Sequence, residues 1–246
     1  MRSSAVAVES HFSEAEQLAE EALTLGRRAQ SWDAGFSYRI LLFVLRREQG
    51  RLEEIDDVIR ASVDEYVGYG SLRCLVALLE CELGREDGAR RAFDELASAD
   101  FSALPRDGEW LFCLSVLAEV AAHLHDRDRA ATLYGQLLPF ARRNALATGD
   151  VAVGSVARYL GLLASTTSRW DDAARQFEVA IEMNARMGAR PWLAHTQHDY
   201  ARMLLAREAP GDRERAELLL SEALATYREL GMPKASASAL RLTPAR

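Results

Sequence analysis

Apolar residues recur along this chain at the spacing of an amphipathic α-helix, with positions i, i+3 and i+4 falling on one face. The first such stripe joins Phe12, Ala15, Leu18, Ala19 and Ala22. The same spacing returns in residues 40–47, 72–83, 110–124, 151–164 and 192–205. No segment shows the period-two alternation of a half-buried strand, so the pattern predicts helices throughout.

The predicted helices come in pairs, because each periodic segment is followed by a short polar break and a second helical stretch. In the second helix of a pair, a small residue at the expected crossing point precedes a bulky residue by four positions. Examples are Ala89 with Phe93, Ala130 with Tyr134, Ala173 with Phe177 and Ala216 with Leu220, with looser matches beginning at Ile55 and Ala15. Successive crossing residues lie 34 to 43 positions apart, a period typical of stacked helical hairpins. We therefore predict an all-α fold, a right-handed α-α superhelix of about five and a half hairpins.

The period also sets the expected domain boundaries: an N-terminal tail over residues 1–10, a repeat domain over 11–231 and a C-terminal tail over 232–246. The repeat units are expected at residues 11–30, 32–66, 69–100, 108–146, 150–188 and 191–231. The first unit is half a hairpin, which leaves one apolar flank of its helix uncovered. We expect upstream residues, a partner or a second copy of the chain, in a homodimer, to cover that flank.

The unit around Leu160 and Gly161 resembles the tetratricopeptide (TPR) family. These two residues, with Ala173, Phe177 and Ala180, stand at the Leu-Gly, Ala, Phe and Ala positions of that family's repeat. The chain departs from the family pattern where Ala157 replaces a tryptophan and Ala164 replaces a tyrosine, and its units are longer than the usual repeat. The resemblance implies a TPR-like solenoid whose first helices line a concave, peptide-binding groove.

Three segments, residues 12–23, 46–54 and 227–233, are similar to the long repeats of large bacterial regulators. In those proteins a signalling ATPase precedes the repeats, and a LuxR-type helix-turn-helix domain follows in some of them. This resemblance implies a non-catalytic interaction and effector-sensing module, and a chain that is one piece of a larger regulator. A free-standing adaptor that dimerises and binds a peptide is the alternative, and an all-α enzyme is a weaker one.

Charge and composition limit the classes of partner and the cellular location that we expect for this protein. The chain carries 37 acidic and 30 basic residues, a formal charge of −7, which argues against direct binding of a nucleic-acid backbone. The longest apolar run, residues 40–45, is too short to span a membrane. Cys74 and Cys81 lie too far apart on one helix for a disulfide. We therefore expect all three cysteines to be buried thiols and the protein to be cytoplasmic.

The sequence contains no phosphate-binding GxxxxGK[ST] motif, and none of the GxGxxG, HExxH or GxSxG motifs, so we expect no cofactor and no catalytic residue. The acidic residues 53–57 suit the first turn of a helix, where the macrodipole favours carboxylates, better than a metal site. For His195 and His198, which share a helix face, metal binding, ligand contact and ordinary polar surface all stay open. Four tryptophans near helix starts are expected to be packing anchors between repeats: Trp32, Trp110, Trp170 and Trp192.

The TPR-like register assigns eight residues to the groove, and they are the predicted binding site. They are Arg47, Glu48, Glu119, His123, Arg158, His195, His198 and Arg202. The C-terminal half of this set is basic, which suggests a protein or peptide partner, or a small acidic effector. We expect alanine in place of Arg158 and Arg202 to weaken such binding and to leave the thermal melt nearly unchanged.

Overall fold

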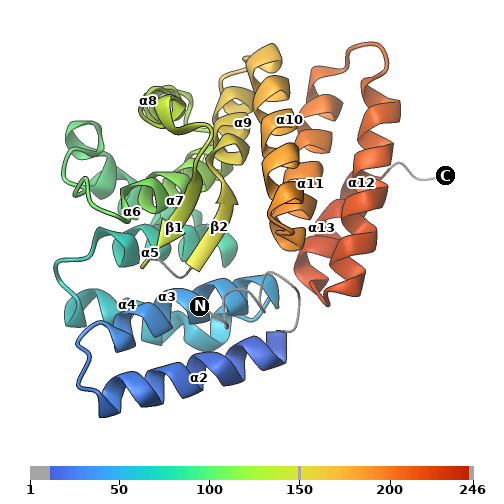
Figure 1. Cartoon of the computed structure of the whole chain (residues 1–246). Coiled ribbons are helices and arrows are strands. Elements are labelled where there is room, and N and C mark those ends of the chain that lie inside the picture. Colours follow the sequence, from blue (N-terminus) through green and yellow to red (C-terminus); the bar gives the residue numbers. More distant parts are fainter. Residues whose placement is uncertain (1–11, 149–150, 244–246) are drawn as a thin grey trace.

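The computed structural model describes residues 12–148 and 151–243, and helices dominate both ranges (Figure 1). Within them, twelve α-helices form successive hairpins along a curved stack, so the expected all-α fold of stacked hairpins is confirmed. The outer helices are α2 (Phe12–Arg28), α4 (Asp56–Glu65), α6 (Glu86–Ala97), α8 (Arg127–Leu137), α10 (Trp170–Arg186) and α12 (Asp212–Glu229). The inner helices are α3 (Ala34–Glu48), α5 (Gly70–Glu82), α7 (Trp110–His123), α9 (Val156–Thr166), α11 (Arg190–Arg207) and α13 (Pro233–Leu242). Short 3-10 turns lie at η1 (Leu52–Ile55), η2 (Ser98–Phe101) and η3 (Leu138–Phe140).

Small residues at the crossings let the two helices of a hairpin approach closely. All four predicted crossing pairs are buried, and Ala89, Phe93, Ala173 and Phe177 have no exposed surface. One close approach is at Gly161 of α9, where an added Cβ atom would lie 2.6 Å from the Phe177 ring. The Phe177 ring on α10 therefore leaves room only for glycine at position 161.

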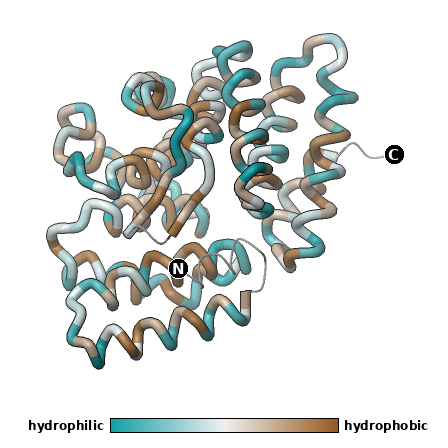
Figure 2. The backbone as a smooth tube through the Cα atoms, viewed as in Figure 1, coloured by the Kyte–Doolittle hydropathy of each residue, from teal (hydrophilic) through white to brown (hydrophobic). Residues whose placement is uncertain are grey.

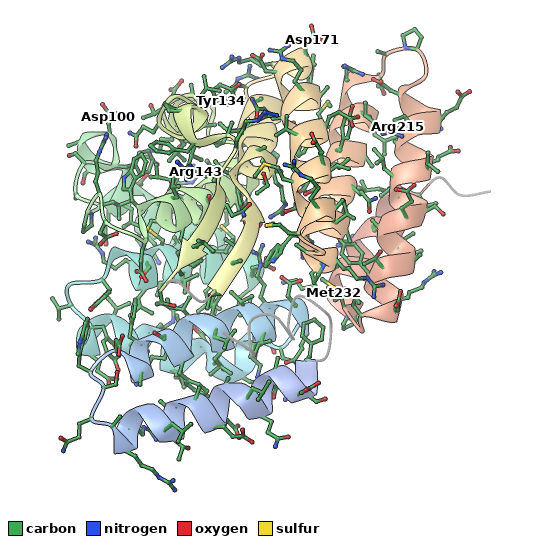
Figure 3. The ribbon with its side chains drawn as sticks, viewed as in Figure 1. Asp100, Tyr134, Arg143, Asp171, Arg215 and Met232 are labelled. Atoms are coloured by element: carbon green, nitrogen blue, oxygen red, sulfur yellow. The ribbon has the colours of Figure 1, made fainter. Side chains whose placement is uncertain are left out.

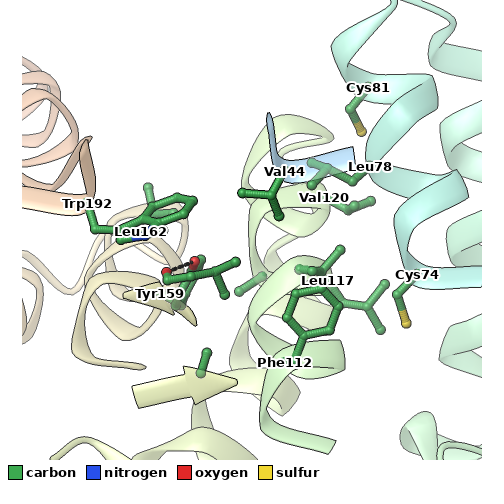
Figure 4. Packing of buried hydrophobic residues seen from close by; sticks show 14 of the residues in the cluster. Val44, Cys74, Leu78, Cys81, Phe112, Leu117, Val120, Tyr159, Leu162 and Trp192 are labelled. Carbon is green, nitrogen blue, oxygen red and sulfur yellow. Dashed lines mark hydrogen bonds between the residues drawn. The ribbon is translucent and has the colours of Figure 1, made fainter. Parts of the chain in front are cut away.

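The inner helices also pack on one another and share a continuous apolar core (Figure 4). Val44 of α3, Leu78 of α5 and Val120 of α7 lie together and are all buried. Tyr159 of α9 is buried nearby and donates its hydroxyl proton to the backbone carbonyl of Val153, at 2.6 Å. Each fully buried large apolar side chain contributes about 1.5–3 kcal/mol, so contacts between successive repeats hold the stack together.

A β-hairpin stands between α8 and α9, where the sequence pattern predicted helix only. Strand β1 (Asn144–Ala147) pairs antiparallel with β2 (Val151–Ser155). Figure 2 shows the chain changing from hydrophilic to hydrophobic as it enters β1. The prediction was wrong for the first residues of segment 151–164, because Gly154 has φ +84° and Trp192 lies 2.8 Å from the position of its missing Cβ atom. The hairpin packs on α7, α10 and α11. It lies across the expected boundary between the units 108–146 and 150–188.

Helix α13 corrects the expectation of a C-terminal tail over residues 232–246. Pro233 starts the helix, a position that suits its fixed φ and its missing N–H, directly after the sharp turn at Gly231. Ala239 of α13 is fully buried, and the helix packs against α12 and α11. It therefore occupies the place of a further inner helix.

The stack curves until its two ends meet. Lys234 of α13 donates to the side-chain carboxylate and the backbone carbonyl of Glu82 at the end of α5, at 2.6 and 2.7 Å. Glu48 of α3 lies 2.7 Å from His195 of α11, measured from Oε2 to Nε2. An added Cβ atom on Gly50, just after α3, would lie only 3.3 Å from the Cβ atom of Lys234. The inner helices therefore form a nearly closed ring.

The N-terminal end of the stack exposes more apolar surface than expected. Helix α2 packs on α3 through Ala15 and Ala19, and the predicted tail over residues 1–10 lies outside the described residues. Trp32 is 72% exposed, which corrects its assignment as a packing anchor, whereas Trp110 and Trp192 are buried as predicted. No further repeat covers the loop that carries Trp32 in the described part of the chain. The homodimer through α2 stays a prediction.

No helix within the described ranges is both long enough and apolar enough to cross a membrane.

Two glycine substitutions should change stability in opposite directions. Gly161→Ala should lower the free energy of unfolding by about 1–3 kcal/mol, because the new methyl group meets the Phe177 ring. Gly135→Ala on the exposed face of α8 should raise it by up to about 1 kcal/mol, because nothing lies within 4 Å and alanine favours the helix. Urea unfolding followed by circular dichroism measures both, and a loss at position 135 equal to that at 161 would contradict this packing.

Candidate functional site

Charged side chains cover the outer surface, as Figure 3 shows for Asp171 at the tip of α10, whose side chain is 94% exposed. A second group of charged side chains lies on the inner side of the stack. There the six inner helices enclose a cavity of about 500 Å³. Lining residues follow the helical period, as in residues 195, 198, 199 and 202 of α11 and residues 234, 235, 238 and 241 of α13. Each inner helix therefore turns one face to the cavity.

All eight predicted groove residues line this single cavity. They are Arg47 and Glu48 of α3, Glu119 and His123 of α7, Arg158 of α9, and His195, His198 and Arg202 of α11. The repeat period was sufficient to bring them together because it identifies the inward face of each inner helix. That they bind a ligand stays a prediction.

Arg47 connects three inner helices. Its Nε donates to Glu82 of α5 at 2.8 Å, its Nη1 donates to Glu119 of α7 at 3.0 Å, and its Nη2 also donates to Glu119. Burial opposes the charge of this guanidinium, but Glu119 and Glu82 outweigh it and raise the pKa of Arg47 well above its ordinary value. Arg47 is thus a fixed positive charge on the α3 side of the cavity.

Arg158 is the most deeply buried cation of the site, with 4% of its surface exposed. Its Nε and Nη2 donate to Asp199 of α11 at 2.9 and 2.8 Å, and its Nη1 lies 3.5 Å from Glu119 of α7. Burial opposes ionisation of Glu119, but Arg47 and Arg158 outweigh it and lower the pKa of Glu119 to about 2. Glu119 therefore stays ionised, and Arg47, Glu119, Arg158 and Asp199 form one continuous network.

The C-terminal part of the groove is basic, as the sequence suggested, but carboxylates lie among the cations of the cavity. Asp199 faces both Arg158 and Arg202, and Glu82 faces both Arg47 and Lys234. We define the N-terminal wall as α3, α5 and α7, and the C-terminal wall as α9, α11 and α13. The N-terminal wall lines the cavity with one arginine and three glutamates, and the C-terminal wall with four cations and one aspartate.

A chain of hydrogen bonds joins the first and last repeats. Because the carboxylate of Glu48 only accepts, the Nε2 of His195 carries a proton, and the Tyr227 hydroxyl oxygen lies 2.9 Å from its Nδ1. The same hydroxyl oxygen lies 3.4 Å from Nδ1 of His198. Burial lowers the pKa of His198 to about 4, although the adjacent Asp199 acts in the opposite direction. His198 is therefore neutral near pH 7.

Sequence reasoning missed five charged or titratable lining residues: Glu82, His125, Asp199, Lys234 and Arg241. Two of them, Lys234 and Arg241, belong to α13, which was expected to be a tail. The spacing of residues 234, 238 and 241 after Pro233 carried the signal of an inner helix. Asp199 lay beside the predicted His198, and Glu82 lay on α5, which carried none of the eight predicted groove residues. The curvature that turns both inward has no local signature.

The site offers little reactive chemistry. The three cysteines are buried free thiols, as expected. Burial raises the pKa of the Cys81 thiol, which lines the cavity, to about 12, so it is not a thiolate at neutral pH. Within the described residues no group of three or more His, Cys, Asp or Glu side chains is placed to hold a metal ion.

Comparison with known proteins adds one structural likeness. No family profile and no curated protein matches the sequence. Among solved structures, a tetratricopeptide repeat protein from Parabacteroides merdae is similar over 97% of this chain and 96% of its own, with 14% identity and a TM-score of 0.38. Similarity at this level defines no family, so the description of the fold rests on the helix packing itself.

His198 should make stability depend on pH between 6.5 and 4.5. Its folded-state pKa, about 4, lies below its ordinary value of 6.5, so in this window only the unfolded chain takes up the proton. The free energy of unfolding should therefore fall as pH falls, by up to about 3 kcal/mol at pH 4, and be constant above pH 6.5. Glu119 adds its own loss only below its ordinary pKa of 4.5.

Urea unfolding of the wild type and His198→Gln across this range measures the effect. In the variant, the free energy of unfolding should change less steeply with pH, by the slope that corresponds to one proton. An unchanged slope would contradict the burial of a neutral imidazole at this position.

Alanine at the two arginines of the C-terminal wall should have very different effects on folding, which corrects the earlier expectation of an unchanged melt. Arg158→Ala takes from the buried Asp199 and Glu119 one of the two cations that each has, and should cost about 3–5 kcal/mol of stability. Arg202→Ala removes a side chain that is 54% exposed and should cost less than about 1 kcal/mol. Urea unfolding of the two variants checks the difference, and equal losses would contradict it.

Proposed function

We propose that this chain is a non-catalytic, effector-binding repeat module that holds its ligand in the cavity between the inner helices. The observation that supports the proposal is the set of charged side chains around the cavity, drawn from all six inner helices. Burying ionised groups costs several kcal/mol each, and replacing them with apolar residues is often neutral or stabilising. Stability alone does not account for the network, whereas recognition of a polar ligand does.

The ring closure favours a compact ligand over a long peptide. In an open repeat array an extended peptide runs along the groove from one end to the other. Here the contacts of Glu48 with His195 and of Lys234 with Glu82 join the walls at one level of the cavity. A volume of about 500 Å³ lies within the range of small-molecule sites, roughly 300–1,000 Å³.

Ligand binding in the cavity is consistent with a module that belongs to a bacterial regulator. The likeness of segments 12–23, 46–54 and 227–233 to the repeats of bacterial LuxR-type and signalling-ATPase regulators supports placing the module in such a protein. Ligand binding in the cavity would change the packing between the two walls, because their ion pairs span it. That change would reach an attached domain through the ends of the stack.

The dimerising adaptor is a second candidate, favoured by large apolar side chains near the N-terminal end. Leu25, Trp32 and Val67 are 63%, 72% and 84% exposed. Exposed side chains of this size are typical of contacts with another macromolecule. This candidate predicts a dimer in solution, whereas the effector-binding module does not require one.

A cavity-filling variant tests the proposed function. Ser238→Trp on α13 places a large ring in the cavity, and Ser221→Trp on the exposed side of α12 is the matched control. A collection of small polar metabolites is screened by thermal shift against all three proteins. At least one compound should raise the melting temperature of the wild type and Ser221→Trp and leave Ser238→Trp unchanged. Equal shifts in all three proteins, or no shift with any compound, would contradict the proposal.

A further inference from the structure

The two walls of the cavity carry opposite charge. The N-terminal wall presents Arg47 with the carboxylates of Glu48, Glu82 and Glu119. The C-terminal wall presents a single carboxylate among four cations: Asp199 with Arg158, Arg202, Lys234 and Arg241. Where the walls touch, their charges pair, as Lys234 does with Glu82. Within each wall further pairs form, such as Arg47 with Glu82 and Arg158 with Asp199.

Each wall retains unused hydrogen-bonding capacity. Oε1 of Glu48 and Nη1 of Arg158 have no hydrogen-bond partner among the described residues, although both side chains are about 95% buried. Arg202 makes one contact, with Asp199 at 3.1 Å, and is otherwise open. The acidic wall thus holds an acceptor without a hydrogen-bond partner. The basic wall holds a donor that has only a longer ionic contact, with Glu119 at 3.5 Å, beside the half-exposed guanidinium of Arg202. Unsatisfied buried polar atoms are costly, so a ligand that satisfies both gains free energy from each.

The two groups contact neighbouring turns of the same helix, α11. Glu48 contacts α11 at His195, and Arg158 contacts the same helix at Asp199. Residues four apart on a helix are separated by one turn, with Cβ atoms roughly 6 Å apart. Glu48 and Arg158 therefore lie beside neighbouring turns of α11, where a single molecule is able to contact both.

We propose that the cavity binds a small zwitterion, an amino acid or a dipeptide with free termini, whose ammonium group faces Glu48 and whose carboxylate faces Arg158 and Arg202. This assignment rests on the proposed function, since it specifies the effector of the same cavity. The ammonium group supplies donors that Glu48 lacks, and the carboxylate accepts from the guanidinium groups in charge-assisted hydrogen bonds. Both ligand charges stay paired inside the ring, which avoids the cost of burying either alone.

The ligand series tests the assignment without altering the fold. The twenty free amino acids and dialanine are screened by thermal shift, and the strongest binder is titrated calorimetrically beside its N-acetyl and its amide derivatives. Each derivative removes one charge and should bind at least about tenfold more weakly than the zwitterion. Equal affinity of the zwitterion and either derivative, or no binding by any of the twenty-one probes, would overturn the proposal.

Two protein variants assign each end of the ligand. Glu48→Gln should weaken binding of the zwitterion about tenfold and leave the N-acetyl derivative unchanged, because that derivative has no ammonium group to lose. Arg202→Gln should weaken the zwitterion and leave the amide unchanged. Glu217→Gln and Arg213→Gln, on the exposed side of α12, are the matched controls and should bind like the wild type.

The outcomes separate this inference from the function beneath it. If another metabolite stabilises the wild type but not Ser238→Trp, while no zwitterion binds, the cavity is a ligand site and the zwitterion assignment is wrong. If Glu48→Gln weakens the N-acetyl derivative as much as the zwitterion, the ligand lies in the opposite orientation or elsewhere. The same holds if Arg202→Gln weakens the amide as much as the zwitterion. Either result overturns the assignment of the ligand's ends.

Discussion

The buried guanidinium of Arg158 is the interaction on which the arrangement of the inner helices depends. A charge this deep needs partners, and it has Asp199 on α11 and Glu119 on α7. Glu119 in turn holds Arg47, which reaches back to α3 and α5. Five successive inner helices, from α3 to α11, are therefore tied to each other through one network. A different curvature of the stack would separate these groups and leave an unpaired charge in the interior.

Hydrophobic burial and the ionic network make different contributions. The apolar crossings, such as Gly161 against Phe177, hold each hairpin together and supply most of the free energy of folding. They are tolerant of small changes in the angle between repeats, because one apolar contact replaces another. Ion pairs have fixed partners and short distances, so they select one curvature among many that the apolar contacts allow. The closed ring follows from that selection.

The ring also explains how a repeat array can form an enclosed site. Solenoids bind along an extended concave surface, because each repeat contacts only its neighbours. In this chain α13 adds an inner helix beyond the last full hairpin, and Lys234 attaches it to α5, which is 152 residues earlier in the sequence. The cavity lies between the inner helices and is partly open to solvent, and residues of both walls line it. Ligand binding in the cavity and closure of the ring are coupled, because both depend on the charges of the two walls.

The sequence by itself determined the helices, their pairing and the inward face of each inner helix. Hydrophobic period is a local property, and it was enough to place Arg47, Arg158 and His195 in one site. Tertiary structure alone decided the curvature, the strands of the β-hairpin and the partner of each charge. Charge pairs between residues more than a hundred positions apart, such as Glu82 and Lys234, leave no periodic trace in the sequence. Their contact depends on small angles that accumulate over five repeats, and such angles are set by packing rather than by any single segment.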